Sequence, residues 1–368
     1  MTTILIFPFD LLSHYLRCLV LADTYDKSTH RIIFLTSERY SQYVHQHGYQ
    51  TFSCKQFDSA YVMKCAGNFD FSWLNYEDLE EVMLDQVSAI QSFRADIVIG
   101  DMAPTLRMSA EYCKVTYLSL MNGYMTRHYA STRKIPSTHK ASKLFSILPE
   151  SISDLLTDFA EKRTFIKMHE PFARIRAKYQ LQPILDYLSE MEGDQNLICD
   201  LPDLFPQKQL PVNYTFTGPL IYNYQQEEEE WLSQLNKERP VIVVTMGSSG
   251  EWTHLSFLNS PYYSKYIIIT AGDNAHVLFA PHIIPKRFVN LSAVLQQADL
   301  MICHGGNGTI YSGISNKVFM LCLSSHFEQE WNIAALEKNG YGKSARNFDE
   351  TLWKKHISEA LEPAFEHA

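Results

Sequence analysis

The stretch that decides the fold reads Asp299-Leu-Met-Ile-Cys303, followed at once by His304-Gly-Gly-Asn-Gly-Thr309. The first five residues are typical of a short buried strand, and the glycines after them predict a tight turn into a helix. Backbone amides and a partial positive charge at such a helix start favour a bound phosphate. No lysine follows the glycines and the G-x-G-x-x-G spacing is absent, which excludes a Walker loop and a dinucleotide fingerprint. The spacing alone fits both an anion site and a tight structural turn.

The same alternation of short apolar strands and helical stretches extends over both halves of the chain. In the second half, strands are predicted at residues 240–246, 266–270, 299–303 and 317–323. In the first half, they are predicted at residues 2–8, 31–36, 49–54, 96–100 and 115–120. Strands that alternate with helices predict parallel sheets with helices on their faces. The expected fold class is therefore α/β, with two Rossmann-like parallel-sheet domains facing a cleft, where ligands bind beyond the carboxyl ends of the strands.

The junction between the two domains is expected in an irregular segment. Residues 202–219 carry four prolines, and four consecutive glutamates follow at residues 227–230. Because side chains on adjacent residues point in different directions, the glutamates predict a solvated helix start and not a metal site. We expect an N-terminal domain over residues 1–215 and a C-terminal domain over residues 216–368.

Length and composition exclude several classes of protein. The chain has 368 residues, 46% of them hydrophobic, and a formal net charge of −9. The acidic balance disfavours a protein that coats nucleic acid. The seven cysteines form no C-x-x-C pair, so a zinc cage is unsupported and reduced thiols in a cytoplasm are expected. No apolar run approaches the ~18 residues needed to span a bilayer, and the apolar N-terminus is predicted to be a strand and not a signal peptide.

Further groups downstream of the glycine run complete a pattern. Glu328-Gln329 is followed by Asn332, and Gly340-x-Gly342 comes after a predicted helix. Together with residues 304–309, this pattern resembles the donor signature of family-one glycosyltransferases, which include the UDP-glycosyltransferases and the bacterial natural-product and macrolide glycosyltransferases. A weaker likeness covers most of the chain, such as the Thr217-Gly-Pro219 that resembles the family's interdomain Gly-Pro. The resemblance implies the GT-B fold.

The resemblance also implies a donor site in the C-terminal domain for a UDP- or dTDP-sugar, which is a co-substrate and not a bound cofactor. The residues that it assigns to the diphosphate follow two strands of that domain: His304, Gly306, Asn307, Gly308, Thr309, Ser248 and Ser249. It assigns Val289 and Leu291 to the base pocket. Since no D-x-D occurs in the chain, no metal is expected.

The resemblance assigns recognition of the donor sugar to two adjacent residues, a carboxylate and a carboxamide. Glu328 and Gln329 would hydrogen-bond the sugar hydroxyls, because the carboxylate accepts while the amide both donates and accepts. Departures from the family pattern leave room for an altered donor site. They are Ser312, where the family often has a ribose-binding glutamate, and Phe319 and Ser324, each in place of a proline.

A second constellation lies in the N-terminal half. His14 follows the first predicted strand and Asp101 ends the strand at residues 96–100, so both are expected at the carboxyl edge of one sheet. A histidine can take a proton from a hydroxyl near pH 7, and an aspartate fixes its tautomer. A histidine at a helix start can also be a cap or surface residue. The family's catalytic base and its aspartate occupy the matching places, which implies an inverting transfer with His14 and Asp101 as the catalytic pair.

A third feature is a basic stretch. Residues 112–149 contain no Asp or Glu, and six Lys or Arg residues occur between positions 114 and 143: Lys114, Arg127, Arg133, Lys134, Lys140 and Lys143. In a chain of net charge −9, these charges without acidic neighbours predict either a solvated loop or an electropositive lip. Such a lip would recruit an anionic acceptor or contact an acidic membrane surface.

The sequence therefore predicts an inverting glycosyltransferase that moves a sugar to a hydroxyl of a small, partly apolar or aromatic acceptor. Its partners are expected to be that acceptor and the nucleotide sugar, with no nucleic acid. The alternatives are another enzyme on the same fold, such as a glycolipid glycosyltransferase at a membrane surface or a nucleotide-sugar epimerase, and a non-catalytic partner protein with a relict donor site. The family's fold also implies that the C-terminal helix, at residues 353–361, packs back on the N-terminal domain.

Overall fold

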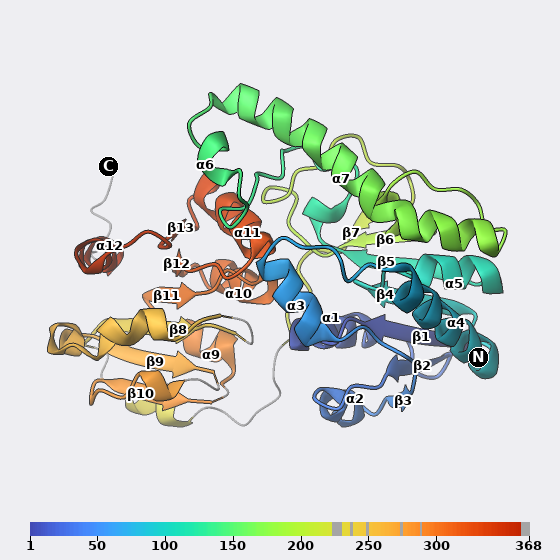
Figure 1. The fold of residues 1–368 in the computed structure, drawn as a ribbon. Helices are drawn as coiled ribbons and strands as arrows, with labels where there is room; N and C mark the ends of the chain where they lie inside the picture. The colour runs from blue at the N-terminus through green and yellow to red at the C-terminus, as the bar shows by residue number, and fades with distance from the viewer. Residues whose placement is uncertain (223–229, 236–237, 248–249, 273–274, 288, 362–368) are drawn as a thin grey trace. The chain divides into compact units, whose positions relative to one another are not determined.

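The computed structural model describes residues 1–222, 230–235, 238–247, 250–272, 275–287 and 289–361 (Figure 1). Contacts between residues divide the chain into two compact units, Met1–Tyr222 (unit 1) and Asn223–Ala368 (unit 2). Each unit contains one sheet in which the described strands all run parallel, with helices around it. The predicted α/β fold class is confirmed.

Unit 1 is built on a seven-stranded sheet in the order β3-β2-β1-β4-β5-β6-β7. The strands are β1 (Thr2–Pro8), β2 (His30–Leu35), β3 (Gln50–Phe52), β4 (Ile97–Asp101), β5 (Thr116–Met121), β6 (Gln195–Ile198) and β7 (Tyr214–Phe216). At the centre, β1 is buried from Ile4 to Phe7 because helices cover both faces of the sheet, and it therefore reads as a continuous apolar run. Its end lies beside the end of β4, where Pro8 is opposite Asp101.

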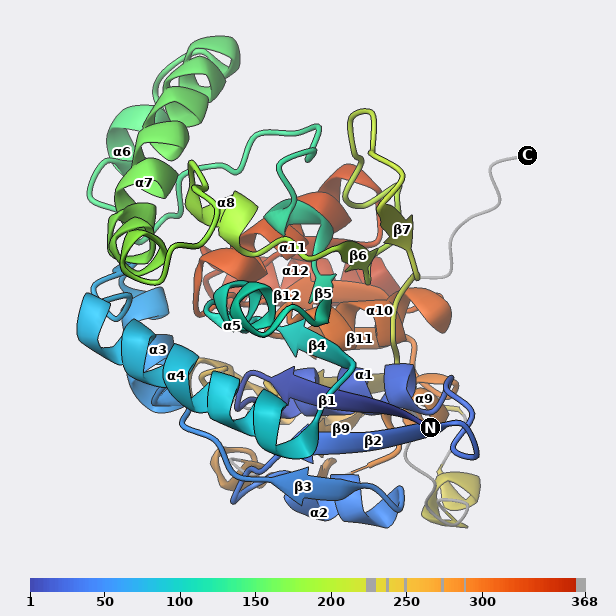
Figure 2. The same cartoon turned by 90° about the vertical axis from the view of Figure 1, so that its right-hand side faces the viewer.

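The helices of unit 1 separate into two layers. They are α1 (Leu12–Ala22), α2 (Ser41–Gln46), α3 (Ser59–Gly67), α4 (Tyr76–Phe93), α5 (Leu106–Cys113), α6 (Ser142–Phe145), α7 (Glu150–Lys178) and α8 (Tyr187–Glu190). Successive side chains of a strand point to opposite faces, so Ile4 and Ile6 of β1 pack in the core that contains α1. Leu5 and Phe7 pack in the core on the other face, with residues of α4 and α5. Figure 2 shows α4 running along one face of this sheet.

The boundary between the units differs from the expected one. The structure divides after Tyr222, whereas the sequence analysis placed the division after residue 215. That earlier boundary would cut through β7, whose Thr215 pairs with Leu197 of β6 in the first sheet. Beyond β7, the phenol oxygen of Tyr222 lies 2.8 Å from Nε2 of His47 in unit 1. Strand pairing and this contact keep residues 216–222 with unit 1.

Unit 2 has a six-stranded sheet in the order β10-β9-β8-β11-β12-β13. The strands are β8 (Val241–Thr245), β9 (Ile267–Ala271), β10 (Ile283–Lys286), β11 (Leu300–Cys303), β12 (Phe319–Cys322) and β13 (Gly342–Ser344), and the α-helices are α9 (Leu291–Leu295), α10 (Asn307–Ser315), α11 (Phe327–Lys338) and α12 (Glu350–Leu361). Short 3-10 helices occur in both units: η1 (Gly123–Met125), η2 (Glu230–Gln234), η3 (Thr253–Asn259), η4 (Pro261–Lys265) and η5 (Ala275–Val277). The stretch at residues 299–309 forms β11, the predicted turn and the start of α10.

The last helix belongs to the core of unit 2. Trp353 and Ile357 of α12 are buried in the same cluster as Leu300 and Ile302 of β11. The apolar face of α12 is therefore used within unit 2, and packing of this helix on the N-terminal domain stays a prediction. Among the described residues, no helix combines the length and apolar character that crossing a membrane requires.

Candidate active-site residues of the two units

The two residues predicted to form the catalytic pair are in contact in unit 1. His14 lies in the first turn of α1, and its Nδ1 is 2.8 Å from Oδ1 of Asp101, the last residue of β4. Asp101 is fully buried, whereas the His14 side chain keeps 16% of its surface exposed. Nδ1 also lies 3.1 Å from Nη2 of Arg17, which can only donate. We assign the proton to Nδ1 because its contact with the carboxylate, which only accepts hydrogen bonds, is the shorter of the two, and Nε2 is then the basic nitrogen. This geometry suits a general base that accepts a proton at Nε2.

Arg17, one turn after His14 on α1, completes the arrangement. Its Nε and Nη2 atoms donate to the two carboxylate oxygens of Asp101, and its Nη1 donates to Oδ1 of Asn122 over 2.9 Å. Burial by itself raises the pKa of Asp101, but the charges of Arg17 and then His14 outweigh it and lower that pKa to about 2.

Sequence reasoning did not find Arg17. Its only signal is a cation that interrupts the apolar face of α1, beside the buried Cys18 and Leu19. A long cation in such a position is buried only with a partner, and the partner, Asp101, is 84 positions away along the chain.

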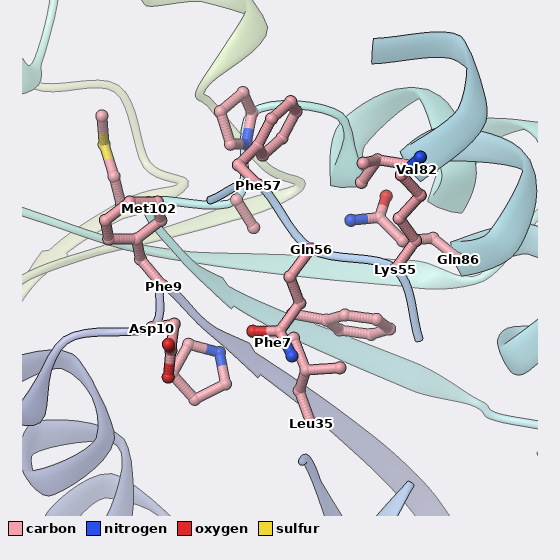
Figure 3. A pocket seen from close by; sticks show the side chains of 13 residues that line it. Phe7, Phe9, Asp10, Leu35, Lys55, Gln56, Phe57, Val82, Gln86 and Met102 are labelled. Carbon is pink, nitrogen blue, oxygen red and sulfur yellow. The ribbon is translucent and has the colours of Figure 1, made fainter. Parts of the chain in front are cut away.

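A hollow opens at the carboxyl edge of the unit 1 sheet, on the face that carries α4 and α5 (Figure 3). Much of its apolar lining comes from Phe7, Phe9, Phe57 and Met102. The ring of Phe9 also lies edge-on to the imidazole of His14, with 5.8 Å between ring centroids. One aromatic side chain thus connects the hollow with the histidine–aspartate pair.

Gln86 of α4 supplies a polar group to this hollow. It is 4% exposed, and its Oε1 accepts hydrogen bonds from Oγ1 of Thr105 over 2.9 Å and from Oγ of Ser109 over 2.7 Å. In the part of the chain that the structure describes, the Thr105 hydroxyl has no other acceptor, so the amide oxygen must face the two hydroxyls. The Nε2 amide is left as a donor for the hollow. A glutamine within a helix matches no motif, and sequence reasoning missed it.

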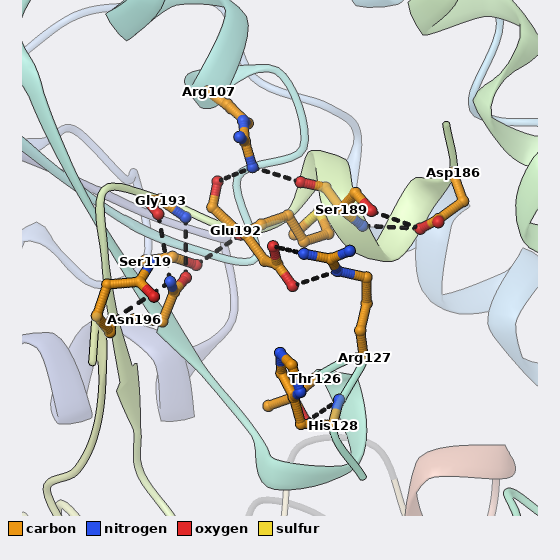
Figure 4. Close-up of polar contacts among 12 residues, drawn as sticks. Arg107, Ser119, Thr126, Arg127, His128, Asp186, Ser189, Glu192, Gly193 and Asn196 are labelled. Atoms are coloured by element: carbon orange, nitrogen blue, oxygen red, sulfur yellow. Dashed lines mark hydrogen bonds and ion pairs between the residues drawn. The ribbon is translucent and has the colours of Figure 1, made fainter. Parts of the chain in front are cut away.

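The basic stretch proves to be partly neutralised by acids from outside it. Arg127 forms a two-pronged ion pair with Glu192, whose two N–O distances are both 2.7 Å (Figure 4). Arg107 holds the same segment by donating to the carbonyl oxygens of Ser189 and Glu192. The acids that pair with Arg133 and Lys134 are Glu161 for the first, and Glu150 and Asp154 for the second. The expectation that all six charges lack acidic partners is therefore wrong, since three of the six have them.

In unit 2, the predicted turn between β11 and α10 encloses the ring of His304. A Cβ at Gly306 would lie 2.3 Å from Nε2 of His304, and one at Gly247 would lie 2.6 Å from its Cε1. Gly305, which lies between His304 and Gly306 in the sequence, has φ of +81°, a backbone conformation that favours glycine. Gly306 is also the N-cap of α10 and has no side chain to cap its first amides. The glycines are thus required by close approach to His304 and by a left-handed turn.

His304 itself is 7% exposed, and its Nδ1 has no hydrogen-bond partner within the described ranges. Burial, and then the nearby His326, lower the pKa of His304 to about 4. The imidazole is therefore neutral at pH 7. A weak polar contact with the backbone of Thr245 acts against this lowering of the pKa. The ring nitrogen nearest to the uncapped start of α10 is Nε2, so a ligand bound at that helix start would meet Nε2.

The residues predicted to bind the sugar differ in their surroundings. Gln329 of α11 is 2% exposed, and its Oε1 accepts a hydrogen bond from the amide of Ser325 over 2.6 Å. Glu328, its neighbour in the first turn of α11, is half-buried. Asn332, one turn further on, donates from Nδ2 to the carbonyl oxygen of Gly305 over 2.9 Å. Gln329 and Asn332 thus take part in holding the turns around the site, and Glu328 is the more accessible of the predicted pair.

The other residues predicted to bind the donor differ in burial and in hydrogen bonding. Val289 is buried, Leu291 begins α9, and Asn307, Gly308 and Thr309 form the first turn of α10 with Gly308 exposed. Ser312 donates from Oγ to the carbonyl oxygen of Gly308 over 2.9 Å, so its hydroxyl already has an acceptor. Ser248 and Ser249 lie outside the described residues. Within the ranges that the structure covers, no three His, Cys, Asp or Glu side chains gather as a metal site would require.

Comparisons with known proteins extend over nearly the whole chain. No family model matches it. A PGL/p-HBAD biosynthesis glycosyltransferase of Mycobacterium tuberculosis is 25% identical over 338 residues, which cover 90% of this chain and 77% of the relative. A PGL/p-HBAD biosynthesis rhamnosyltransferase of Mycobacterium bovis is 22% identical over 366 residues, with coverages of 95% and 77%. Another relative, from the same organism, is named an inactive PGL/p-HBAD biosynthesis glycosyltransferase and is 25% identical over 65% of this chain and 64% of its own.

Solved structures with the same fold are also glycosyltransferases. The glycosyltransferase of kitacinnamycin has a TM-score of 0.73 at 14% identity, and the calicheamicin glycosyltransferase CalG4 has 0.70 at 16%, each match covering 99% of this chain and 91% of the other. The spinosyn rhamnosyltransferase SpnG, complexed with thymidine diphosphate, has 0.68 at 15%, with coverages of 98% and 92%. The comparisons confirm the predicted resemblance to family-one glycosyltransferases, the GT-B fold and the class of enzyme, a glycosyltransferase.

Proposed function

We propose that this glycosyltransferase inverts the anomeric centre of a UDP- or dTDP-linked sugar, with the donor held by unit 2 and the acceptor hydroxyl deprotonated by His14 of unit 1. The observation that carries the proposal is the contact of His14 with a buried, ionised Asp101. A buried carboxylate that contacts a partly exposed imidazole keeps that imidazole in one tautomer with Nε2 available. General-base help of this kind contributes typically ~10²–10⁴ in rate.

In the proposed reaction, the acceptor oxygen attacks the anomeric carbon from the face opposite the nucleoside diphosphate. The new C–O bond forms as the bond to the diphosphate oxygen breaks, and the hydroxyl proton passes to Nε2 of His14. Negative charge grows on the departing diphosphate. The amides that begin α10 and the neutral His304 are placed to stabilise that charge, which is the usual way in which fixed dipoles lower such a barrier.

The cradle around His304 supports the donor side of the proposal. Gly247 and Gly306 leave room for the ring, and its Nε2, the nitrogen nearest to the start of α10, is the polar atom that would meet a diphosphate oxygen. SpnG and VinC, two structural neighbours, have been solved with thymidine diphosphate and dTDP. Because Ser312 is occupied by the carbonyl oxygen of Gly308, we propose that the ribose is held here without the glutamate that the family often has at this position.

The hollow of unit 1 supports an acceptor that is partly apolar or aromatic. Phe9 and Phe57 offer ring faces and edges, and the Nε2 amide of Gln86 offers one hydrogen-bond donor among them. We propose that the acceptor carries an oxygen that accepts this hydrogen bond in addition to the hydroxyl that receives the sugar. The chain's seven cysteines are free thiols, which suits the proposed cytoplasmic location.

One observation favours the second candidate, a non-catalytic protein with a relict donor site. The amide oxygen of Gln329 is engaged with the amide of Ser325, and one relative is named inactive. The two candidates differ in nucleotide binding and in turnover. Calorimetry with UDP and dTDP should detect binding, and turnover with phenolic acceptors should fall by about 10²-fold or more in His14→Ala while nucleotide affinity stays unchanged. Binding of neither nucleotide would establish the relict site, and full turnover by His14→Ala would exclude His14 as the base.

A further inference from the structure

Large apolar side chains cover an exposed face on the helical arm of unit 1, formed by α6 and the first half of α7. Figure 1 and Figure 2 both draw this arm projecting beyond the sheet of unit 1. Leu155 is 71% exposed and Ile147 is 77% exposed. The exposed apolar members of the face are Leu144, Ile147, Ile152, Leu155, Leu156, Phe159 and Ile166. We call this surface, together with the cations described below, the arm face.

The first half of α7 exposes its apolar side and buries polar residues, which is the reverse of an ordinary surface helix. Its large apolar residues at positions 152, 155, 156, 159 and 166 recur every three or four residues and therefore share one side of the helix. That side is exposed, whereas the residues buried against unit 1 in this half are Ser153 and Thr157. A helix normally buries its apolar stripe and exposes its polar side chains. The inversion leaves the apolar stripe without a partner within unit 1.

Cations without acidic partners surround the apolar stripe. Lys140, Lys143, Lys162, Arg163 and Lys167 are all exposed and have no ion-pair partner in the described part of the chain. The guanidinium of Arg163 lies over the ring of Phe159, 4.5 Å from its centroid. Most acids of the same helix form ion pairs with other cations. Glu150 and Asp154 pair with Lys134, and Glu161 pairs with Arg133. Asp158 and Glu170 are exposed. Residues 133–170 hold seven Lys or Arg against five Asp or Glu, in a chain of net charge −9.

We propose that the arm face docks on the surface of an anionic lipid bilayer. Apolar side chains of one helix face enter the boundary between headgroups and acyl chains, and lysines and arginines beside them attract anionic headgroups. A second copy of the chain fits less well, because a two-fold interface brings a patch against itself and these cations would face one another. The proposal does not rest on the proposed function, and it moves the membrane contact from residues 114–143 to residues 140–167.

Co-sedimentation of the full-length chain with vesicles tests this proposal. The wild type should bind vesicles of phosphatidylcholine mixed with phosphatidylglycerol, bind pure phosphatidylcholine vesicles weakly, and lose affinity as salt is raised. Leu155→Gln/Phe159→Gln should lower the affinity for anionic vesicles by roughly tenfold or more, and so should Lys162→Glu/Arg163→Glu/Lys167→Glu. All substitutions are at exposed positions, where changes in stability are small, and thermal melts would verify that each variant is folded.

Matched controls separate the arm face from general hydrophobicity and charge. Leu185→Gln/Val212→Gln changes two apolar residues of unit 1 that are exposed elsewhere, and Arg31→Glu/Lys114→Glu/Lys208→Glu changes charge by the same amount at exposed positions of unit 1 outside residues 133–170. Both controls should bind anionic vesicles like the wild type. The proposal is overturned if the wild type ignores anionic vesicles or if the arm variants bind as well as it does. It is also overturned if light scattering finds a dimer that the arm variants convert to a monomer, since a second copy would then cover the face.

Discussion

The guanidinium of Arg17 donates to both carboxylate oxygens of Asp101, and its Nη2 also lies 3.1 Å from Nδ1 of His14. The residue that orients the proposed base is thus itself held by a buried cation. Because Asp101 is fully buried, the ion pair with Arg17 fixes the position of its carboxylate and thereby the imidazole that contacts it. Arg17 and His14 both belong to α1.

Removing the guanidinium should be costly. In Arg17→Met, Asp101 stays buried and loses its main counter-charge, which typically destabilises a fold by about 3–5 kcal/mol. The double variant Arg17→Met/Asp101→Asn removes both charges and should recover part of that loss. Urea melts of the three proteins check this expectation. Equal destabilisation in the single and double variants would mean that the Arg17–Asp101 ion pair does not account for the cost.

Acid should remove the contribution of Asp101. Its folded pKa, about 2, lies below the ordinary value of an unfolded aspartate, so its ionised form stabilises the fold above that ordinary value, near 4. This contribution is lost as the pH falls from about 4 towards 2, and its size is on the order of 2 kcal/mol.

The measurement for this acid effect is a pair of denaturation series. The difference in unfolding free energy between wild type and Asp101→Asn should be largest near neutral pH and should shrink as the pH falls below about 4. A difference that stays constant through this range would show that Asp101 has no lowered pKa in the folded protein.

Gln86 should discriminate between acceptors that differ in one oxygen. Gln86→Met keeps a similar length but removes the Nε2 donor, so it should weaken binding of 4-hydroxybenzoate methyl ester by roughly fivefold to tenfold, the usual cost of one hydrogen bond. Binding of 4-ethylphenol, which lacks the carbonyl group, should change little. Thermal-shift titration of both compounds gives the two affinities. Equal losses for both compounds in Gln86→Met would contradict the assigned donor.

The glycines of the turn offer a matched pair of substitutions. A Cβ at Gly306 would lie 2.3 Å from Nε2 of His304, whereas a Cβ at Gly308 would meet nothing within 4 Å. Gly306→Ala should therefore displace His304 and destabilise unit 2 by about 1–3 kcal/mol, and Gly308→Ala should leave stability nearly unchanged. Nucleotide titrations separate a second effect. If the diphosphate approaches the start of α10, Gly308→Ala should lower UDP or dTDP affinity without loss of stability, and an unchanged affinity would place the diphosphate elsewhere.

Local patterns were sufficient for the fold class and for part of the site. Apolar runs that alternate with amphipathic stretches predicted β1–β5, β8, β9, β11 and β12, because parallel strands are buried on both faces. The short strands β6, β7, β10 and β13 were not predicted. The glycines at residues 305–308 predicted the turn into α10, since backbone geometry there depends on neighbouring residues alone. The pairing of His14 with Asp101 could also be predicted, because the ends of adjacent parallel strands meet at one edge of a sheet.

The partners of charged and buried polar side chains could be identified only in the folded chain. The acid that neutralises Arg127 is 65 positions away along the chain, and the one that neutralises Arg133 is 28 positions away. Half of the cations in a stretch without acidic residues therefore proved to have acidic partners. Arg17 and Gln86 carry no motif, and their roles depend on partners from other elements. Periodicity and turn chemistry act between near neighbours and can be read along a chain, whereas burial and ion pairing join residues that only packing brings together. For that reason the sequence alone predicted the α/β class of unit 1 and most of its strands, while the strand order and the setting of the proposed base depend on the tertiary structure.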